Sequence, residues 1–144
     1  MQRSDILRKL IGFPTISADP NSDLIAYCAD LLRGVGAQVL IIKDPVQSKA
    51  NLYATIGPRD RAGVLLSGHT DVVPVAGQDW TVPPFKMTEK DGKVFGRGST
   101  DMKGFIACAL SAALSASTMD LKTPLHLALS YDEEIGCIGV RSMI

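Results

Sequence analysis

The chain has 144 residues, with 15 basic and 15 acidic side chains and a formal net charge of zero. This length suits one domain with a hydrophobic core and is too short for two ordinary domains. A neutral chain without a basic stripe gives little support for nucleic acid or anionic membrane as a partner, and no run approaches the roughly 18 apolar residues of a membrane-spanning helix.

The start of the sequence, residues 1–10, mixes charged with apolar side chains and lacks the apolar core of a signal peptide, which favours a cytoplasmic protein. Three cysteines, Cys28, Cys108 and Cys137, lie far apart among small or apolar neighbours. Their spacing fits neither a zinc ribbon nor a redox motif, so we expect reduced, buried thiols.

Two short helices are predicted in the first quarter of the chain. Residues 5–11 place apolar side chains on one helical face, with Ser4 as the N-cap. A second apolar pattern begins at Asn21 or Ser22 and ends at Gly34. This second helix should pack on a sheet.

Strands dominate the next segment. Residues 39–42, 52–56 and 64–66 are apolar runs bounded by turn-forming residues, and residues 125–130 alternate leucine with smaller or polar side chains. Helices interleaved with apolar strands favour an α/β sheet that is mixed and covered on both faces.

The second half adds a loop, a hairpin and a helix. Residues 72–85 form a proline-rich loop, in which Trp80 and Phe85 either cover the core edge or contact a substrate. Residues 86–95 predict a hairpin with Asp-Gly in its turn. An alanine-rich helix over residues 102–116 follows. The last residues, 138–144, begin another helical pattern.

Chemically active side chains follow the apolar runs. His69 and Asp71 come directly after one predicted strand, and the acidic run Asp132-Glu133-Glu134 follows another. Asp101 stands immediately before the alanine-rich helix. Because open α/β sheets keep their chemistry at the carboxyl ends of strands, one histidine with several carboxylates predicts a metal site there.

The roles within such a site can be divided. A hydrolytic metal centre needs ligands and a separate base that deprotonates water, and the adjacent Glu133 and Glu134 could share these tasks. Asp71 is placed to accept the proton of the second ring nitrogen of His69. Asp101 could bridge two ions about 3.5 to 4 Å apart.

Less specific interpretations remain for each motif. A histidine beside an aspartate is often a structural pair, and the acidic run could be a solvated cluster. The glycines at 96 and 98 are similar to a phosphate loop, but the order of a dinucleotide or P-loop motif is not kept. His126, inside a strand, favours a structural or surface role over a metal role.

Three motifs together resemble the M20 metallopeptidase and deacylase family: residues 67–74 (SGHTDVVP), 96–104 (GRGSTDMKG) and 132–136 (DEEIG). All three occur in order, and the similarity extends over nearly the whole chain. Within the family, enzymes that deacetylate N2-acetyl-L-ornithine are the most similar. The segments that carry this similarity are residues 13–17, 49–52, 54–58 and 101–107.

The resemblance implies a fold, a set of ligands and a reaction. The fold would be a three-layer, zinc-exopeptidase-like sandwich with a mixed, mostly parallel sheet. His69 would bind one zinc or cobalt ion, Asp101 would bridge to a second ion and Glu134 would bind that second ion. Glu133 would be the general base, and Asp71 would orient His69. The reaction would be hydrolysis of N2-acetyl-L-ornithine, a small N-acylated amino acid, to L-ornithine and acetate in arginine biosynthesis. A cis peptide between Asp101 and Met102 is also implied.

Family members are much longer than this sequence. Residues 1–144 would therefore form the amino-terminal part of the catalytic domain, without the inserted dimerisation domain, the carboxyl-terminal part and the later ligands. The full-length form would be a homodimer, and the isolated chain a truncated, inactive fragment. Alternatives are succinyl-diaminopimelate desuccinylase or another M20 deacylase or peptidase. An alternative of another class is a non-catalytic fragment or pseudoenzyme that acts only by association.

Overall fold

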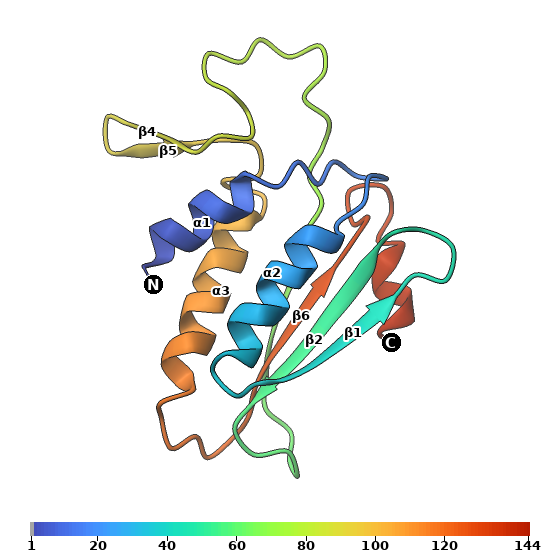
Figure 1. Ribbon diagram of the computed structural model, residues 1–144, viewed down its shortest axis with the longest axis vertical. Coiled ribbons are helices and arrows are strands. Elements are labelled where there is room, and N and C mark those ends of the chain that lie inside the picture. Colours follow the sequence, from blue (N-terminus) through green and yellow to red (C-terminus); the bar gives the residue numbers. More distant parts are fainter. Residues whose placement is uncertain (1) are drawn as a thin grey trace.

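The computed structural model describes residues 2–144 (Figure 1). The helices are α1 (Arg3–Ile11), α2 (Ser22–Arg33), α3 (Lys103–Ala116) and the 3-10 helix η1 (Gly139–Ser142). The strands are β1 (Gln38–Lys43), β2 (Ala50–Ile56), β3 (Val64–His69), β4 (Thr88–Lys90), β5 (Lys93–Phe95) and β6 (Leu125–Ser130). Each predicted strand and helix is present, although α1 begins earlier than expected. Its N-cap is Gln2, whose backbone N–H donates to the Asp5 carboxylate at 3.1 Å.

The four-stranded sheet has the order β1-β2-β6-β3 and is mixed, as predicted. Only β3 and β6 pair in parallel, whereas β1 with β2 and β2 with β6 are antiparallel. The prediction of a mostly parallel sheet is therefore wrong for these strands. The connections explain the difference. A loop of six residues, 44–49, joins antiparallel neighbours, whereas the parallel pair is connected by a long crossover that contains α3.

The core lies between the sheet and helices α2 and α3, which cover one of its faces, and α1 packs against α3 (Figure 1). Fully buried side chains from α2, β2, α3 and β6 meet there: Leu24, Cys28, Leu52, Ala54, Ile106, Leu110, Leu127 and Leu129. On the opposite face Leu40 is 56% and Leu65 51% exposed, and η1 is the helical segment packed there. The described residues thus supply two layers of the expected three-layer sandwich.

The expectation of three buried thiols is wrong for two of them. Cys28 is buried in α2, whereas Cys108 and Cys137 are exposed, and all three are free. In α3 the inward positions are Ile106 and Leu110, so the helical period turns Cys108 outward. Cys137 follows β6 in a surface turn that precedes the 3-10 helix.

Candidate metal centre

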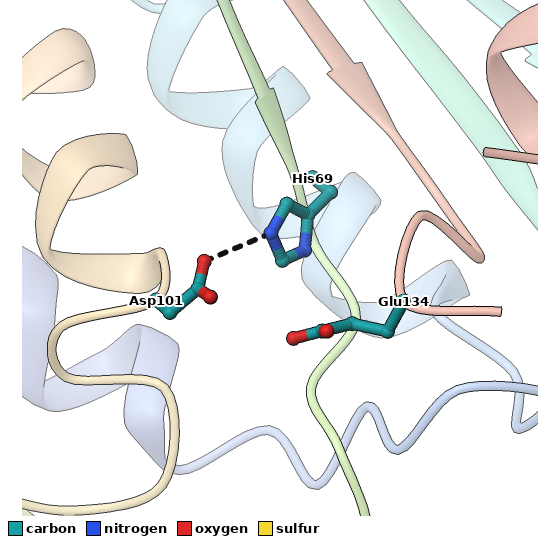
Figure 2. A group of neighbouring side chains, drawn as sticks. All are labelled: His69, Asp101 and Glu134. Carbon is teal, nitrogen blue, oxygen red and sulfur yellow. Dashed lines mark hydrogen bonds and ion pairs between the residues drawn. The ribbon is translucent and has the colours of Figure 1, made fainter. Parts of the chain in front are cut away.

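The candidate site lies where two parallel strands end at the same edge of the sheet. His69 is the last residue of β3 and pairs in register with Ser130, the last residue of β6. Glu134 follows β6 in a turn, and Asp101 comes from the loop that precedes α3 (Figure 2). The topology therefore brings His69 close to Asp101 and Glu134, which follow it in the sequence by 32 and 65 residues.

The side chains of His69, Asp101 and Glu134 point toward one another (Figure 2). One ligand atom from each lies within 4.8 Å of the other two. The Nε2 atom of His69 is 3.1 Å from Oδ1 of Asp101 and 3.7 Å from Oε2 of Glu133. One histidine nitrogen and three carboxylates thus meet at the predicted edge. The peptide between Asp101 and Met102 is cis, which confirms that expectation.

Asp71 connects the histidine to the turn after β6. Its Oδ1 atom is 3.4 Å from Nδ1 of His69, and its backbone carbonyl is 3.0 Å from the same nitrogen. Its two carboxylate oxygens also accept the backbone N–H groups of Glu133 at 3.0 Å and Glu134 at 3.2 Å. The Ser17 hydroxyl donates to Oδ2 at 2.7 Å. With the proton on Nδ1 facing these oxygens, Nε2 of His69 is left free to bind a cation.

The pKa shifts show how negative the site is. Burial lowers the pKa of His69, but Asp71 and then Asp101 outweigh it and raise that pKa to about 9. Burial raises the pKa of Asp71, whereas hydrogen bonds from His69, Ser17 and two backbone amides lower it to about 2. Burial, followed by the charge of Asp101, raises the pKa of Glu134. Crowded carboxylates around one imidazole stabilise positive charge between them.

This donor set fits a divalent cation. Imidazole nitrogen with carboxylate oxygens is a ligand combination that zinc and similar ions accept in proteins. The buried Asp71 orients the imidazole from behind, as partners of metal-binding histidines commonly do. The residues present therefore suit the metal that the sequence predicts.

The side chains beneath the site had no predicted function. Lys49 and Asp132 form a buried ion pair, with 2.5 Å between Nζ and Oδ2. Asn21 donates to Thr70 at 3.1 Å, and Thr15 donates to the Thr70 carbonyl at 2.6 Å. These contacts bridge segments 49 to 83 residues apart, and no local sequence pattern reports them.

Other residues singled out in the sequence lie outside this cluster. His126 is in the opposite half of β6, 2.9 Å from the Thr55 hydroxyl and stacked on Tyr53, in agreement with a structural role. The Trp80 ring lies 5.0 Å from the Arg97 guanidinium, and its Nε1 donates to Gln78 at 3.2 Å. Trp80 thus contacts Gln78 of its own loop and Arg97, which follows β5.

A cluster of one histidine and several carboxylates at the strand ends of a mixed α/β sheet is typical of metal-dependent hydrolases. The family described as "Peptidase family M20/M25/M40" matches residues 65–144. Because this match covers more than half of the sequence, the chain belongs to this family. Membership supports a hydrolase, and the donor set of His69, Asp101 and Glu134 fits a divalent metal.

Relatives and solved structures agree with this assignment. The chain is 40% identical to an acetylornithine deacetylase from Shigella sonnei (strain Ss046), over 95% of this chain and 37% of that protein. Human carnosine dipeptidase 1 superposes with a TM-score of 0.82 at 26% identity, covering 98% of this chain and 34% of that one. An M20 family metallo-carboxypeptidase from Sulfolobus solfataricus has a TM-score of 0.86 at 23% identity, covering 100% and 34%.

The chain spans between about a third and two fifths of the length of these relatives. Within residues 2–144, none of the helices has both the length and the apolar character needed to cross a membrane.

Proposed function

We propose that the chain supplies catalytic residues to a metal-dependent amide hydrolase that deacetylates N2-acetyl-L-ornithine, giving L-ornithine and acetate in arginine biosynthesis in the cytoplasm. The observation that carries the reaction type is the approach of His69, Asp101 and Glu134 within 4.8 Å, with Glu133 beside them. The substrate is supported by the 40% identity to an acetylornithine deacetylase.

Two divalent ions, zinc or cobalt, are proposed as cofactors. His69 and Asp101 would hold one ion, and Asp101 and Glu134 would hold the other, which makes Asp101 the bridging ligand. Divalent ions bound there would act as Lewis acids that polarise the amide carbonyl and lower the pKa of water.

The protein's own groups would carry the proton. Glu133 is suited to be the general base because its carboxylate borders the ligand cluster while its backbone N–H is held by Asp71 at 3.0 Å. In the proposed reaction Glu133 removes a proton from the attacking water as the carbon–oxygen bond forms. It then delivers this proton to the amine nitrogen as the carbon–nitrogen bond breaks. Asp71 keeps the proton of His69 on Nδ1, which directs Nε2 toward the cation.

We also propose that residues 1–144 correspond to the amino-terminal part of the catalytic domain. Support comes from the 37% of the deacetylase that the match covers. The full-length form would be a homodimer. Because each ion has only two proposed ligands here, and a catalytic zinc usually has three, the isolated chain should bind metal weakly and be inactive.

Two other assignments compete with this proposal. Succinyl-diaminopimelate desuccinylase or another M20 deacylase or peptidase would use the same residues, and the solved relatives include a dipeptidase and a carboxypeptidase. A non-catalytic fragment or pseudoenzyme that acts by association would instead leave His69, Asp101 and Glu134 without a role in metal binding.

A chimaera tests the proposal. Residues 1–144 replace the matching segment of the Shigella sonnei acetylornithine deacetylase, and hydrolysis of N2-acetyl-L-ornithine and of N-succinyl-diaminopimelate is measured with zinc or cobalt present. We expect deacetylation that Asp101→Asn abolishes and His126→Gln leaves unchanged. A folded, metal-loaded chimaera without turnover would refute the proposed function, and preferential hydrolysis of the succinyl substrate would favour the first alternative.

A further inference from the structure

A buried ion pair lies directly before the proposed general base. The side chains of Lys49 and Asp132 are 1% and 4% exposed, and Nζ of the lysine is 2.5 Å from Oδ2 of the aspartate. Lysine and aspartate are seldom buried so completely, because both charges lose their hydration. Such a pair is weak evidence for stability, so its position next to Glu133 calls for another explanation.

The pair holds the backbone at the point where β6 turns toward the site. Asp132 has φ of 52°, in the left-handed region that non-glycine residues rarely adopt. Both of its oxygens are engaged, Oδ2 by Lys49 and Oδ1 by the backbone N–H of Ala18 at 3.0 Å. A residue in this conformation persists where its surroundings fix it, and here three segments of the chain meet on one carboxylate.

The two residues after Asp132 are held from the other side. Asp71 accepts the backbone N–H groups of Glu133 and Glu134, and Ser17 donates to the same aspartate. The turn is thus fixed by two carboxylates, both of which contact the Ser17–Ala18 segment. The Glu133 side chain is left free of this framework and reaches to 3.7 Å from Nε2 of His69.

We infer that Lys49 is a positioning residue for the general base: through its buried ion pair with Asp132 it fixes the turn that directs Glu133 to the metal centre. This inference rests on the proposed function for the role of Glu133. The position of the turn itself can be measured without turnover. A purely structural pair would stabilise the whole sheet equally, whereas a positioning pair acts first on the residues that follow Asp132.

Two variants of the pair differ in whether a buried charge is left without its partner. Lys49→Met removes the cation and leaves Asp132 buried and unpaired, which destabilises the fold as a whole and makes this variant a poor test of the turn alone. The double variant Lys49→Met with Asp132→Asn removes both charges and keeps a residue that tolerates the left-handed conformation. Lys122→Met is the matched control, because Lys122 is also 2.5 Å from an aspartate, Asp120, in a pair that is 83% and 86% exposed.

The first measurement is amide hydrogen exchange in the 144-residue chain, followed residue by residue by NMR. In the double variant we expect protection of the Glu133 and Glu134 amides to fall at least about tenfold, while the β6 core amides of Leu127 and Leu129 and the Lys122→Met control change less than about twofold. Unchanged protection at Glu133 and Glu134, or an equal loss at the core amides, would overturn the inference.

The second measurement is kinetic and uses the chimaera. Measured at saturating metal, the double variant should lower kcat at least about thirtyfold and leave KM within about twofold, since substrate still binds while the base is misplaced. An unchanged kcat would contradict the positioning role. If the unsubstituted chimaera does not turn over, the proposed function fails, and the exchange experiment still decides whether Lys49 fixes the turn.

Discussion

The carboxylate of Asp71 accepts the backbone N–H of Glu133 at 3.0 Å, across 62 residues of sequence. Since the same carboxylate lies 3.4 Å from Nδ1 of His69, it joins the end of β3 to the turn after β6. The orientation of the proposed histidine ligand and the position of the proposed base are therefore set by one buried side chain.

Asp71→Asn in the chimaera should weaken metal binding about 10- to 100-fold, because the neutral amide no longer stabilises the Nδ1-protonated form of His69. Cobalt titration followed by absorbance measures this affinity. Asp120→Asn, at an exposed position, is the control and should leave it unchanged. If Asp71→Asn bound cobalt as tightly as the parent, Asp71 would not support the metal centre.

Glu133→Gln in the chimaera should keep the metal content and lose most turnover, because it removes the base without removing a proposed ligand. Glu134→Gln should instead lower the metal occupancy. Metal analysis and kcat are measured on the same samples. Turnover of Glu133→Gln within about tenfold of the parent, a barrier change of only about 1.4 kcal/mol, would mean that another group is the base.

Cys28 should make the chain less stable at alkaline pH. Burial raises the pKa of this thiol from 9.0 to about 12 in the folded chain. Between pH 9 and 12 the unfolded chain has lost the thiol proton and the folded chain has kept it, so this contribution to stability falls as pH rises, by about 1.4 kcal/mol per pH unit.

Urea denaturation at pH 8 and pH 10.5 measures this effect as a difference between the parent and Cys28→Ala. The variant should be less stable at pH 8, because it leaves a cavity, but its free energy of unfolding should decline less steeply with pH. Equal declines in the two proteins would contradict the assigned pKa. Cys108→Ala, at an exposed position, is the control.

Much of the fold could be predicted from local patterns. The apolar runs identified the strands, and polar residues directly after two of them marked the edge where His69 and Glu134 meet. The pairing directions were harder to predict. They depend on which strand lies next to which, and β6 enters the sheet between β2 and β3, which a run of apolar residues does not indicate.

The supporting contacts could not be read from the sequence. Lys49 and Asp132 are 83 residues apart, and each looks like an ordinary surface charge until the fold removes both from water. Ser17 lies in a loop without periodicity, so its bond to Asp71 also had no local signal. The proposed ligands His69 and Glu134 lie at or just after strand ends, whereas the contacts that hold them depend on the completed tertiary structure.

Cobalt titration of the 144-residue chain tests the central claim, that His69, Asp101 and Glu134 form a metal site. The account predicts weak binding, with a cobalt absorption band that Asp101→Asn and Glu134→Gln each remove and His126→Gln leaves unchanged. Binding that survives both ligand variants, or that is lost only in His126→Gln, would contradict the account and place any metal elsewhere on the sheet.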